Sequence, residues 1–238
     1  MVSKIKGAYL DNKEWSEKIL KKIDPSFRHR WELFDEQIQQ HLSLKNIWLD
    51  LGCADNAAVA EFSANAKYAV GVDIIRLPDV HKPFVQADIR HLPFFSRSVN
   101  LITLRFVVEH FSARQKYFDE LHRVLQMNGR VILVTTNIWS PFIFLPRMLL
   151  PYKIKHWLLT HIFQVQDEDI FPTFHKVNSK SAIKKIEGFR VVRFDYISDL
   201  NYTRKWMFLI FLFLHLISRL PGLSFLRTNI LAVLEKTD

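Results

Sequence analysis

Short, nearly continuous apolar runs along the chain alternate with stretches in which apolar residues recur at helical spacing. The runs predict strands at 46–51, 68–72, 84–87, 99–104, 130–136, 190–196 and 230–234. The helical spacing predicts helices at 12–23, 31–42, 56–66 and 179–187, and another that Ser112 would cap and the Asn128-Gly129 turn would end. Strands this rich in Val, Ile and Leu are typical of a parallel sheet covered on both faces. We therefore expect an α/β fold with a doubly wound, mostly parallel seven-stranded sheet.

Three segments depart from this alternation. Residues 1–44 precede the first strand and predict N-terminal helices. Residues 138–178 carry four prolines and many aromatics, which indicates a lid or acceptor-binding insertion at the sheet's C-terminal edge. Residues 204–226 form an apolar helical segment. We expect all three to belong to one domain that spans 1–238.

Composition narrows the cellular setting and the partners. The formal net charge is +9, which suits either nucleic acid or an anionic membrane surface. The aromatics crowd apolar stretches such as 142–144 and 208–213 instead of alternating with basic residues, so nucleic acid is the less favoured partner. Cys53 is the only cysteine, and residues 1–15 have no apolar signal core. A cytoplasmic protein is therefore expected.

The stretch WLDLGCADNAAVAEF, residues 48–62, indicates a nucleotide-binding strand, loop and helix. Gly52 would let the backbone approach a ligand closely. Asp73 follows 21 positions later, at the end of the second predicted strand, where a carboxylate can accept hydrogen bonds from ribose hydroxyls. Asp88 ends the third strand, in a position to receive an adenine amino group. In open α/β sheets, ligands bind at this carboxyl edge.

The motifs LDLGC, VGVDI, QADIRHLPF, VVEHF and ELHRVLQMNGRVILVTTN follow one another over residues 45–137. In this order and spacing the sequence resembles class I S-adenosylmethionine-dependent methyltransferases, of the methyltransferase type 11 kind. Each motif alone is weakly specific, but five in register are not. The two later strands fit the closing hairpin of that family, whose last strand runs antiparallel to the others. The resemblance implies an enzyme with S-adenosyl-L-methionine as cofactor.

The resemblance also implies roles for individual residues. Asp50 and Gly52 would line the methionine part of the cofactor, Asp73 would hold the ribose, and Asp88 with Ile89 would meet the adenine. The remaining residues of the predicted cofactor site are Cys53, Ala54, Ile74, Arg105 and Glu109. Glu109 and His110 would lie beside the transfer site, after the fourth strand.

Departures from the family pattern leave two alternatives open. Ala54 and Asn56 stand where the family usually has glycine, Asn100 replaces a frequent acid, and Arg105 a small polar residue. A catalytically degenerate relative that acts as a membrane-associated binding module is one alternative. A dinucleotide-dependent dehydrogenase is the other, but it requires G-x-G-x-x-G, and residues 52–57 read GCADNA.

Methyl transfer to a hydroxyl would benefit from a general base. His110 is the first candidate and His175, from the lid, the second, although either can instead be a structural histidine that packs a loop. The Asp167-Glu168-Asp169 trio is contiguous, so its side chains would diverge, and we expect a solvated loop and no metal.

Residues 206–217 are apolar except for His215, which is too short a run to cross a bilayer. The segment is therefore either buried on the sheet or in peripheral contact with a membrane, together with residues 142–150. The acceptor is expected to be a small molecule, and a lipid-linked or glycan hydroxyl suits the second reading.

Overall fold

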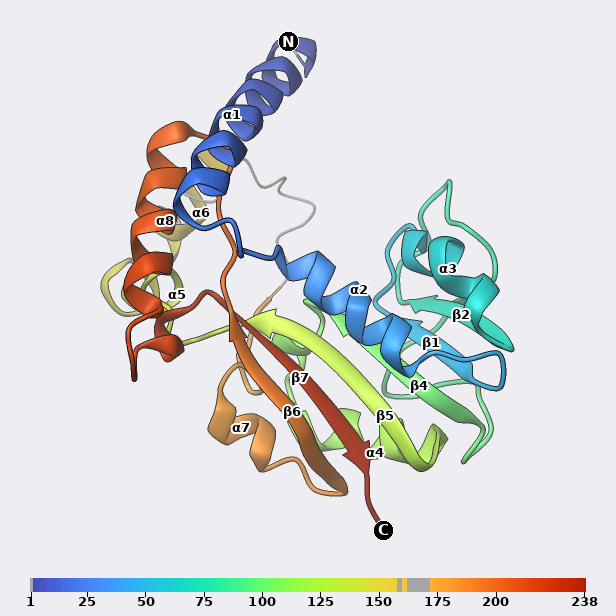
Figure 1. Cartoon of the computed structure of the whole chain (residues 1–238). Coiled ribbons are helices and arrows are strands. Elements are labelled where there is room, and N and C mark those ends of the chain that lie inside the picture. Colours follow the sequence, from blue (N-terminus) through green and yellow to red (C-terminus); the bar gives the residue numbers. More distant parts are fainter. Residues whose placement is uncertain (1, 158–159, 162–171) are drawn as a thin grey trace. The chain divides into compact units, whose positions relative to one another are not determined.

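The structure is a computed structural model that describes residues 2–157, 160–161 and 172–238 (Figure 1). The chain forms two compact units. Unit 1 comprises Met1–Glu32, Trp139–Phe171 and Tyr196–Asn229, and unit 2 comprises Leu33–Ile138, Pro172–Asp195 and Ile230–Asp238. The segment 138–178, predicted as one insertion, is thus divided between the units, with 139–171 in unit 1 and 172–178 in unit 2.

Seven strands form a single sheet in the order β3-β2-β1-β4-β5-β7-β6. Their bounds are β1 Ile47–Leu51, β2 Tyr68–Asp73, β3 Phe84–Gln86, β4 Val99–Arg105, β5 Leu125–Thr136, β6 Phe189–Ile197 and β7 Asn229–Lys236. The pairs β1–β2, β1–β4, β2–β3 and β4–β5 are parallel. Figure 1 shows β7 running opposite to β5 and β6. The doubly wound, mostly parallel seven-stranded sheet is therefore confirmed, including the reversed last strand.

The helices fall into two groups. Those in or leading into the sheet unit are α2 Arg30–His41, α3 Ala57–Phe62, α4 Arg114–Val124 and α7 Lys180–Lys184, with the 3-10 turns η1 Ser63–Asn65 and η2 Val108–His110. Those of unit 1 are α1 Val2–Ile23, α5 Pro141–Leu149, α6 Tyr152–Trp157 and α8 Lys205–Ser218, with the turn η5 Ser224–Leu226. In Figure 1, α2 and α4 cover opposite faces of the sheet.

The core of unit 2 lies on both faces of the central strands. Leu49, Ile102 and Leu133 are fully buried on β1, β4 and β5. Phe34 of α2 and Phe118 of α4 are also fully buried. Burying each such side chain contributes about 1.5–3 kcal/mol, so these strands form a rigid platform for the loops at their ends.

The predicted cap and end of α4 are wrong. The helix begins at Arg114 with Ala113 before it, and no side chain caps it, so Ser112 has no such role. It ends at Val124, because Leu125 is fully buried and enters β5 opposite Val99. Asn128 does adopt the left-handed conformation, with φ of 61°, but inside the irregular start of β5. Burial in the sheet thus outweighs the local turn signal.

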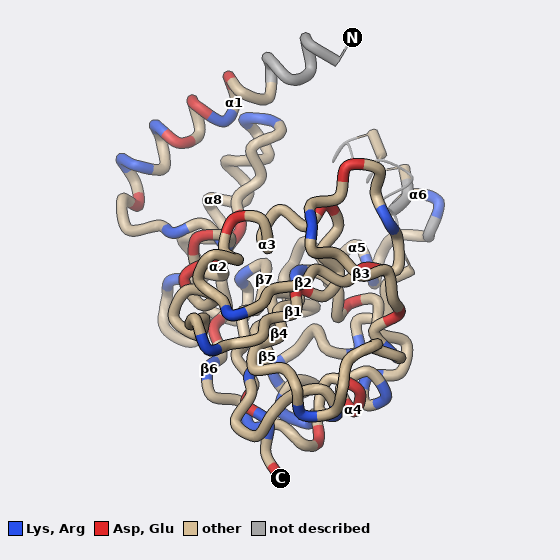
Figure 2. The backbone as a smooth tube through the Cα atoms, turned by 90° about the vertical axis from the view of Figure 1, so that its right-hand side faces the viewer, with Lys and Arg blue, Asp and Glu red and all other residues tan. Residues whose placement is uncertain are grey.

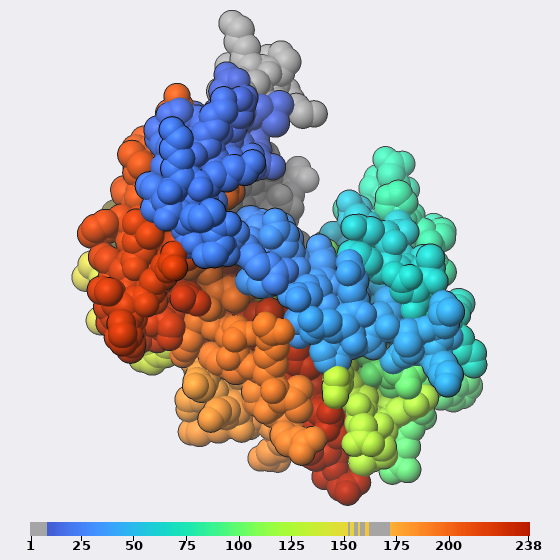
Figure 3. Space-filling view, in the orientation of Figure 1, coloured from blue at the N-terminus to red at the C-terminus, as the bar shows by residue number. Residues whose placement is uncertain are grey.

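In unit 1, α8 packs against α1. Phe208 and Leu212 of α8 form a buried cluster with Leu20 of α1 and Leu200. Charged residues of both signs recur along α1 (Figure 2). The region around α8 forms part of the molecular surface in the view of Figure 3. Among the described residues, no helix is long and apolar enough to span a membrane.

Candidate functional site

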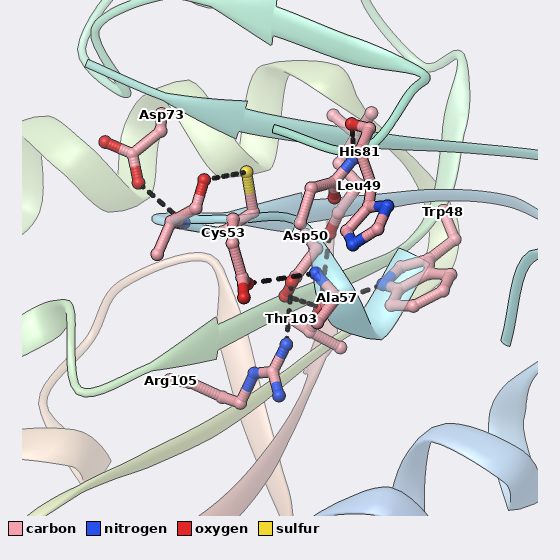
Figure 4. A network of polar contacts seen from close by, with 12 residues as sticks. Trp48, Leu49, Asp50, Cys53, Ala57, Asp73, His81, Thr103 and Arg105 are labelled. Carbon is pink, nitrogen blue, oxygen red and sulfur yellow. Dashed lines mark hydrogen bonds and ion pairs between the residues drawn. The ribbon is translucent and has the colours of Figure 1, made fainter. Parts of the chain in front are cut away.

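The carboxylate of Asp50, the next-to-last residue of β1, is held from two sides (Figure 4). Thr103 donates its hydroxyl to Oδ1 at 2.6 Å, and Arg105 donates Nη2 to Oδ2 at 3.0 Å. Trp48 in turn donates Nε1 to the Thr103 hydroxyl at 2.8 Å. Burial raises the pKa of Asp50, while the charge of Arg105 and the Thr103 hydrogen bond lower it in part. Asp50 therefore acts as the buried anchor of this strand end.

The loop after β1 turns sharply at Gly52. Its φ is 69°, and a Cβ there would lie 2.3 Å from Cγ2 of Val107. Only glycine fits this position. Ala54 also has a positive φ of 50°, a conformation that costs about 1–2 kcal/mol for residues other than glycine. Its amide donates to Oδ2 of Asp73 at 2.9 Å, which fastens the loop to the end of β2.

Asn56 replaces the missing glycine in a specific way. It adopts a φ of 64°, which asparagine tolerates, and its side chain is fully buried. Its Nδ2 donates to the carbonyls of His81 and Pro83, both at 2.8 Å. The residue thus links the loop to the segment that enters β3. Asn56 therefore keeps the positive φ that glycine would allow here and adds two hydrogen bonds that hold the loop.

The other predicted cofactor residues are nearby in the chain but differ in environment. Asp88 pairs with Arg90 at 2.5 Å, and the Arg90 hydrogen bond lowers the pKa of Asp88. Ile89 is half-buried and Ile74 is 62% exposed. Cys53 is buried, and burial raises its pKa to about 12. It is therefore no nucleophile at neutral pH.

The structure brings Glu109, His110 and His175 together after β4. The backbone amides of Phe174 and His175 donate to the carbonyl of Glu109 at 2.7 and 3.2 Å. The Nδ1 atom of His110 lies 2.9 Å from the carbonyl oxygen of Pro172. Two histidines separated by 65 positions therefore share one neighbourhood. Residues 172–175 of the insertion supply the backbone contacts to Glu109 and His110.

Residues that sequence reasoning missed support this neighbourhood. The Glu109 carboxylate is buried and accepts the Thr135 hydroxyl at 2.9 Å. Asn178, fully buried, donates Nδ2 to the hydroxyls of Thr135 and Thr136 at 2.7 and 2.9 Å. The local signal for Thr135 and Thr136 was the polar TTN run at 135–137, whereas Asn178 lies far from it in the chain. Asn100 is structural, since its Oδ1 accepts the Ile47 amide at 2.8 Å.

No cluster of three or more His, Cys, Asp or Glu residues with metal-binding geometry occurs in the described part of the chain. The Asp167-Glu168-Asp169 trio lies outside the described residues.

Comparison with known proteins indicates the family of this site. Residues 49–133 match the family model described as "Methyltransferase domain". This match contains the predicted cofactor loop, Asp73, Asp88, Arg105 and Glu109. Residues 49–133 are therefore similar to the methyltransferase domain family.

Two curated relatives of the methyltransferase domain have matching segments. A demethylmenaquinone methyltransferase of Thermotoga maritima is 37% identical over 51 residues, which are 21% of this chain and 22% of that protein. The uncharacterised methyltransferase YcgJ of Bacillus subtilis is 31% identical over 98 residues, which are 36% of this chain and 39% of YcgJ. The matched segments thus span less than half of either relative.

Solved structures share the fold over most of the chain. The YcgJ structure superposes with a TM-score of 0.53 at 16% identity and covers 88% of this chain and 100% of its own. Geranyl diphosphate C-methyltransferase of Streptomyces coelicolor superposes with a TM-score of 0.53 at 15% identity and covers 87% of this chain and 77% of its own. At such identities the likeness concerns the fold of the methyltransferase domain.

Proposed function

We propose that this protein transfers a methyl group from S-adenosylmethionine to a hydroxyl of a small, lipid-linked or glycan acceptor. One arrangement carries the proposal. The loop 50–56 and Asp73 lie at the carboxyl ends of β1 and β2, and His110 follows the adjacent β4. This is the edge at which open α/β sheets bind ligands.

The residues present fit the cofactor. Gly52 gives the loop its sharp turn and its close packing on Val107, which a side chain would prevent. Asp73 is only half-buried, and each of its oxygens accepts one backbone amide, from Ala54 and Ile75. A carboxylate has about four acceptor sites, so Asp73 retains the capacity to accept ribose hydroxyls. Asp50, Gly52 and Asp73 would hold the cofactor, with Asp88 and Ile89 near the adenine.

When bound, S-adenosylmethionine supplies an electrophilic methyl group on a sulfonium. The chain has to orient the acceptor and take up its hydroxyl proton. The Pro172 carbonyl can only accept a hydrogen bond, so it favours the tautomer in which Nδ1 of His110 carries the hydrogen. In the neutral ring, Nε2 is then the nitrogen that accepts a proton. His110 is the proposed general base, and His175 is held next to it.

The acceptor class rests on the apolar surface of unit 1, where α5 has no buried residue and much of α8 is exposed. Such a surface favours an acceptor that is reached at a membrane over a freely diffusing polar metabolite. We place the protein in the cytoplasm, in peripheral contact with the membrane.

Cofactor carrying a labelled methyl group, added with fractionated lipid and glycan extracts, tests the proposal. Label should enter a lipid or glycan fraction, and His110→Gln should lower the rate by about 10²–10⁴-fold. The matched control is His81→Gln, because the side chain of His81 is exposed and its hydrogen bonds with the loop are made by its backbone amide and carbonyl. Cofactor binding without transfer to any fraction would instead support the degenerate binding module.

A further inference from the structure

The helix α8 has two apolar sides. Met207, Phe208 and Leu212 lie on the side that faces the interior of unit 1, and each is at most 3% exposed. Large apolar side chains also occupy the opposite side, with these exposed fractions: Trp206 51%, Leu209 48%, Ile210 47%, Phe213 67% and Leu216 36%. A surface helix of a globular protein normally carries polar residues there. Packing inside unit 1 therefore explains only one side of α8.

The helix α5 contacts α8 through Phe211, on the inward side of α8, and carries a second exposed apolar area. Phe142 of α5 stacks on Phe211 of α8, with ring centroids 3.7 Å apart and an interplanar angle of 8°. Beyond this contact α5 buries none of its residues. Its exposed side chains are Phe144 36%, Leu145 49%, Met148 66% and Leu149 70%. We call these side chains and the exposed ones of α8 the apolar surface of unit 1. Clusters of large exposed apolar side chains such as these mark interaction sites.

The two segments that carry the apolar surface have charges of one sign. Residues 141–157 and 204–228 contain seven Lys or Arg and no Asp or Glu. Three of the seven contact unit 1 itself: Arg219 pairs with Asp24, Arg227 donates to the Tyr196 carbonyl, and Lys205 lies over the Trp15 ring. Arg147, Lys153 and Arg204 are exposed. An apolar surface with a basic border complements anionic lipid headgroups above an acyl layer.

The dimensions of α8 indicate how it would meet a bilayer. Its 14 residues give a length of about 21 Å, whereas a bilayer core is about 30 Å thick. The helix is therefore suited to lie in the interface. Trp206, half-exposed at the first turn, is of the residue type that favours the membrane–water boundary.

We propose that the apolar surface of unit 1 docks the protein on an anionic membrane, with α5 and α8 lying in the interface and the basic residues on headgroup phosphates. This deepens the proposed function, on which it rests only for the consequence that the protein meets a lipid-linked acceptor at the membrane. The docking itself requires neither cofactor nor acceptor.

Sedimentation of the full chain with vesicles tests the docking. The vesicles are phosphatidylcholine alone or a mixture with phosphatidylglycerol, each at low and at high salt. Binding should be strongest to the anionic vesicles, weaken with salt and persist in part, because the apolar contribution is not screened. Phe213→Ser should weaken binding at least about tenfold, the effect of removing one large buried apolar side chain. Arg147→Glu should abolish part of the salt-sensitive fraction.

Matched controls separate docking from general surface effects. Phe95→Ser changes a side chain that is 88% exposed on unit 2, and Lys116→Glu changes an exposed charge on α4. Neither should alter vesicle binding. The Tm of Phe213→Ser should match that of the unchanged protein, because the side chain is 67% exposed. A change in Tm together with lost binding would assign Phe213 to the core and overturn the docking.

The remaining outcomes distinguish the two proposals. A protein that stays in the supernatant with anionic vesicles at low salt refutes the docking, even if it methylates a water-soluble acceptor. A dimer that Phe213→Ser dissociates, with no vesicle binding, would assign the surface to a second copy. Vesicle binding without methyl transfer supports the docking and counts against the proposed function.

Discussion

The Asn56 side chain occupies the space that any side chain at position 71 would need. A Cβ added to Gly71 would lie 1.9 Å from Oδ1 of Asn56. Gly71 is the fourth residue of β2 and is paired with Asp50 of β1. The Asn56 side chain fits because residue 71, in β2, is a glycine. The two positions form a matched pair.

Gly71→Ala should destabilise the fold by about 1–3 kcal/mol, the usual cost of overpacking, and disturb the loop that Asn56 holds. Asn56→Gly should cost about 1–2 kcal/mol, because two hydrogen bonds are lost while the positive φ becomes unstrained. The double variant should be less destabilised than the sum of the two, since a glycine at position 56 leaves room for a methyl group at position 71. Denaturant unfolding of all four proteins measures this coupling. Additive costs would show that the two side chains do not compete for space.

This pair also shows what sequence patterns could not supply. The apolar runs predicted all seven strands, because burial on a sheet acts over consecutive residues. The bonds of Asn56 reach 25 and 27 positions along the chain, and Glu109 meets Thr135 after 26. Such contacts depend on strand order and register, which a pattern along the chain does not contain.

The sequence predicted those residues of the candidate site that stand at or just after the end of a strand. Asp50, Asp73 and His110 each come at or just after a strand, and the parallel sheet brings these ends to one edge. His175 was named as a candidate from the sequence, but the backbone hydrogen bonds that hold residues 174 and 175 against Glu109 had no local sequence signal. Residues 2–11 of α1 were missed because Gly7 and mixed charges weaken their helical pattern. The assignment of cofactor and catalytic roles stays a prediction.

Asp73→Ala should weaken S-adenosylmethionine binding by about 1.5–3 kcal/mol, or about tenfold to a hundredfold in Kd, the range for hydrogen bonds to a charged group. The variant also removes the acceptor of the Ala54 amide, so the loop loses one of its fixed points. Calorimetric titration measures the change. The control is Asp119→Asn on α4, an exposed carboxylate that should leave Kd unchanged. Equal affinity in the Asp73 variant would remove this residue from the cofactor site.

Arg105→Met should destabilise the protein strongly at pH 7, by about 3–5 kcal/mol, because it leaves the Asp50 carboxylate buried without its partner. Burial already raises the pKa of Asp50, and the loss of Arg105 raises it further. A carboxyl group whose pKa is raised in the folded state destabilises the fold when it is ionised, so the full cost is present at pH values above the folded-state pKa. The cost is absent at pH values below the pKa of the same group in the unfolded chain. The deficit of the variant should therefore shrink as pH falls from 7 towards 4.

Two further variants check the explanation for Arg105. Adding Asp50→Asn to Arg105→Met should recover much of the stability at pH 7, because no charge is then left buried. The matched control is Arg193→Met, whose partner Asp195 is about as exposed as Arg193 itself, at 41% and 40%. That surface pair should be worth about 0–1 kcal/mol. A deficit in Arg105→Met that stays constant with pH would show that lost packing, and not the buried charge, is the cause.

Asp24 fixes the end of α1 to α8 and should make unit 1 sensitive to acid. The Asp24 carboxylate has three side-chain partners. Its Oδ2 lies 2.9 Å from His215 Nε2 and 2.7 Å from Arg219 Nη1, and its Oδ1 accepts the Ser26 hydroxyl. The other ring nitrogen of His215, Nδ1, lies 2.8 Å from the Ser198 hydroxyl. Burial raises the pKa of Asp24, but the hydrogen bonds from His215 and Ser26 and the charge of Arg219 outweigh it. The pKa therefore falls from 3.8 to about 2. These contacts explain why His215 interrupts the apolar run 206–217 of α8.

A group with a lowered folded-state pKa stabilises the fold above its unfolded value and loses that effect as pH falls through the folded value. The Asp24 contribution, about 2 kcal/mol from the shift, should thus be complete above pH 4 and disappear between pH 4 and about 2. Asp24→Asn should be less stable than the unchanged protein at pH 6 and approach it at pH 2.5, whereas Asp119→Asn should follow it throughout. Denaturant unfolding at both pH values decides this. A constant gap between Asp24→Asn and the unchanged protein would mean that the carboxylate charge contributes nothing, and that His215 is held by packing against Phe27, whose ring centroid lies 5.1 Å away.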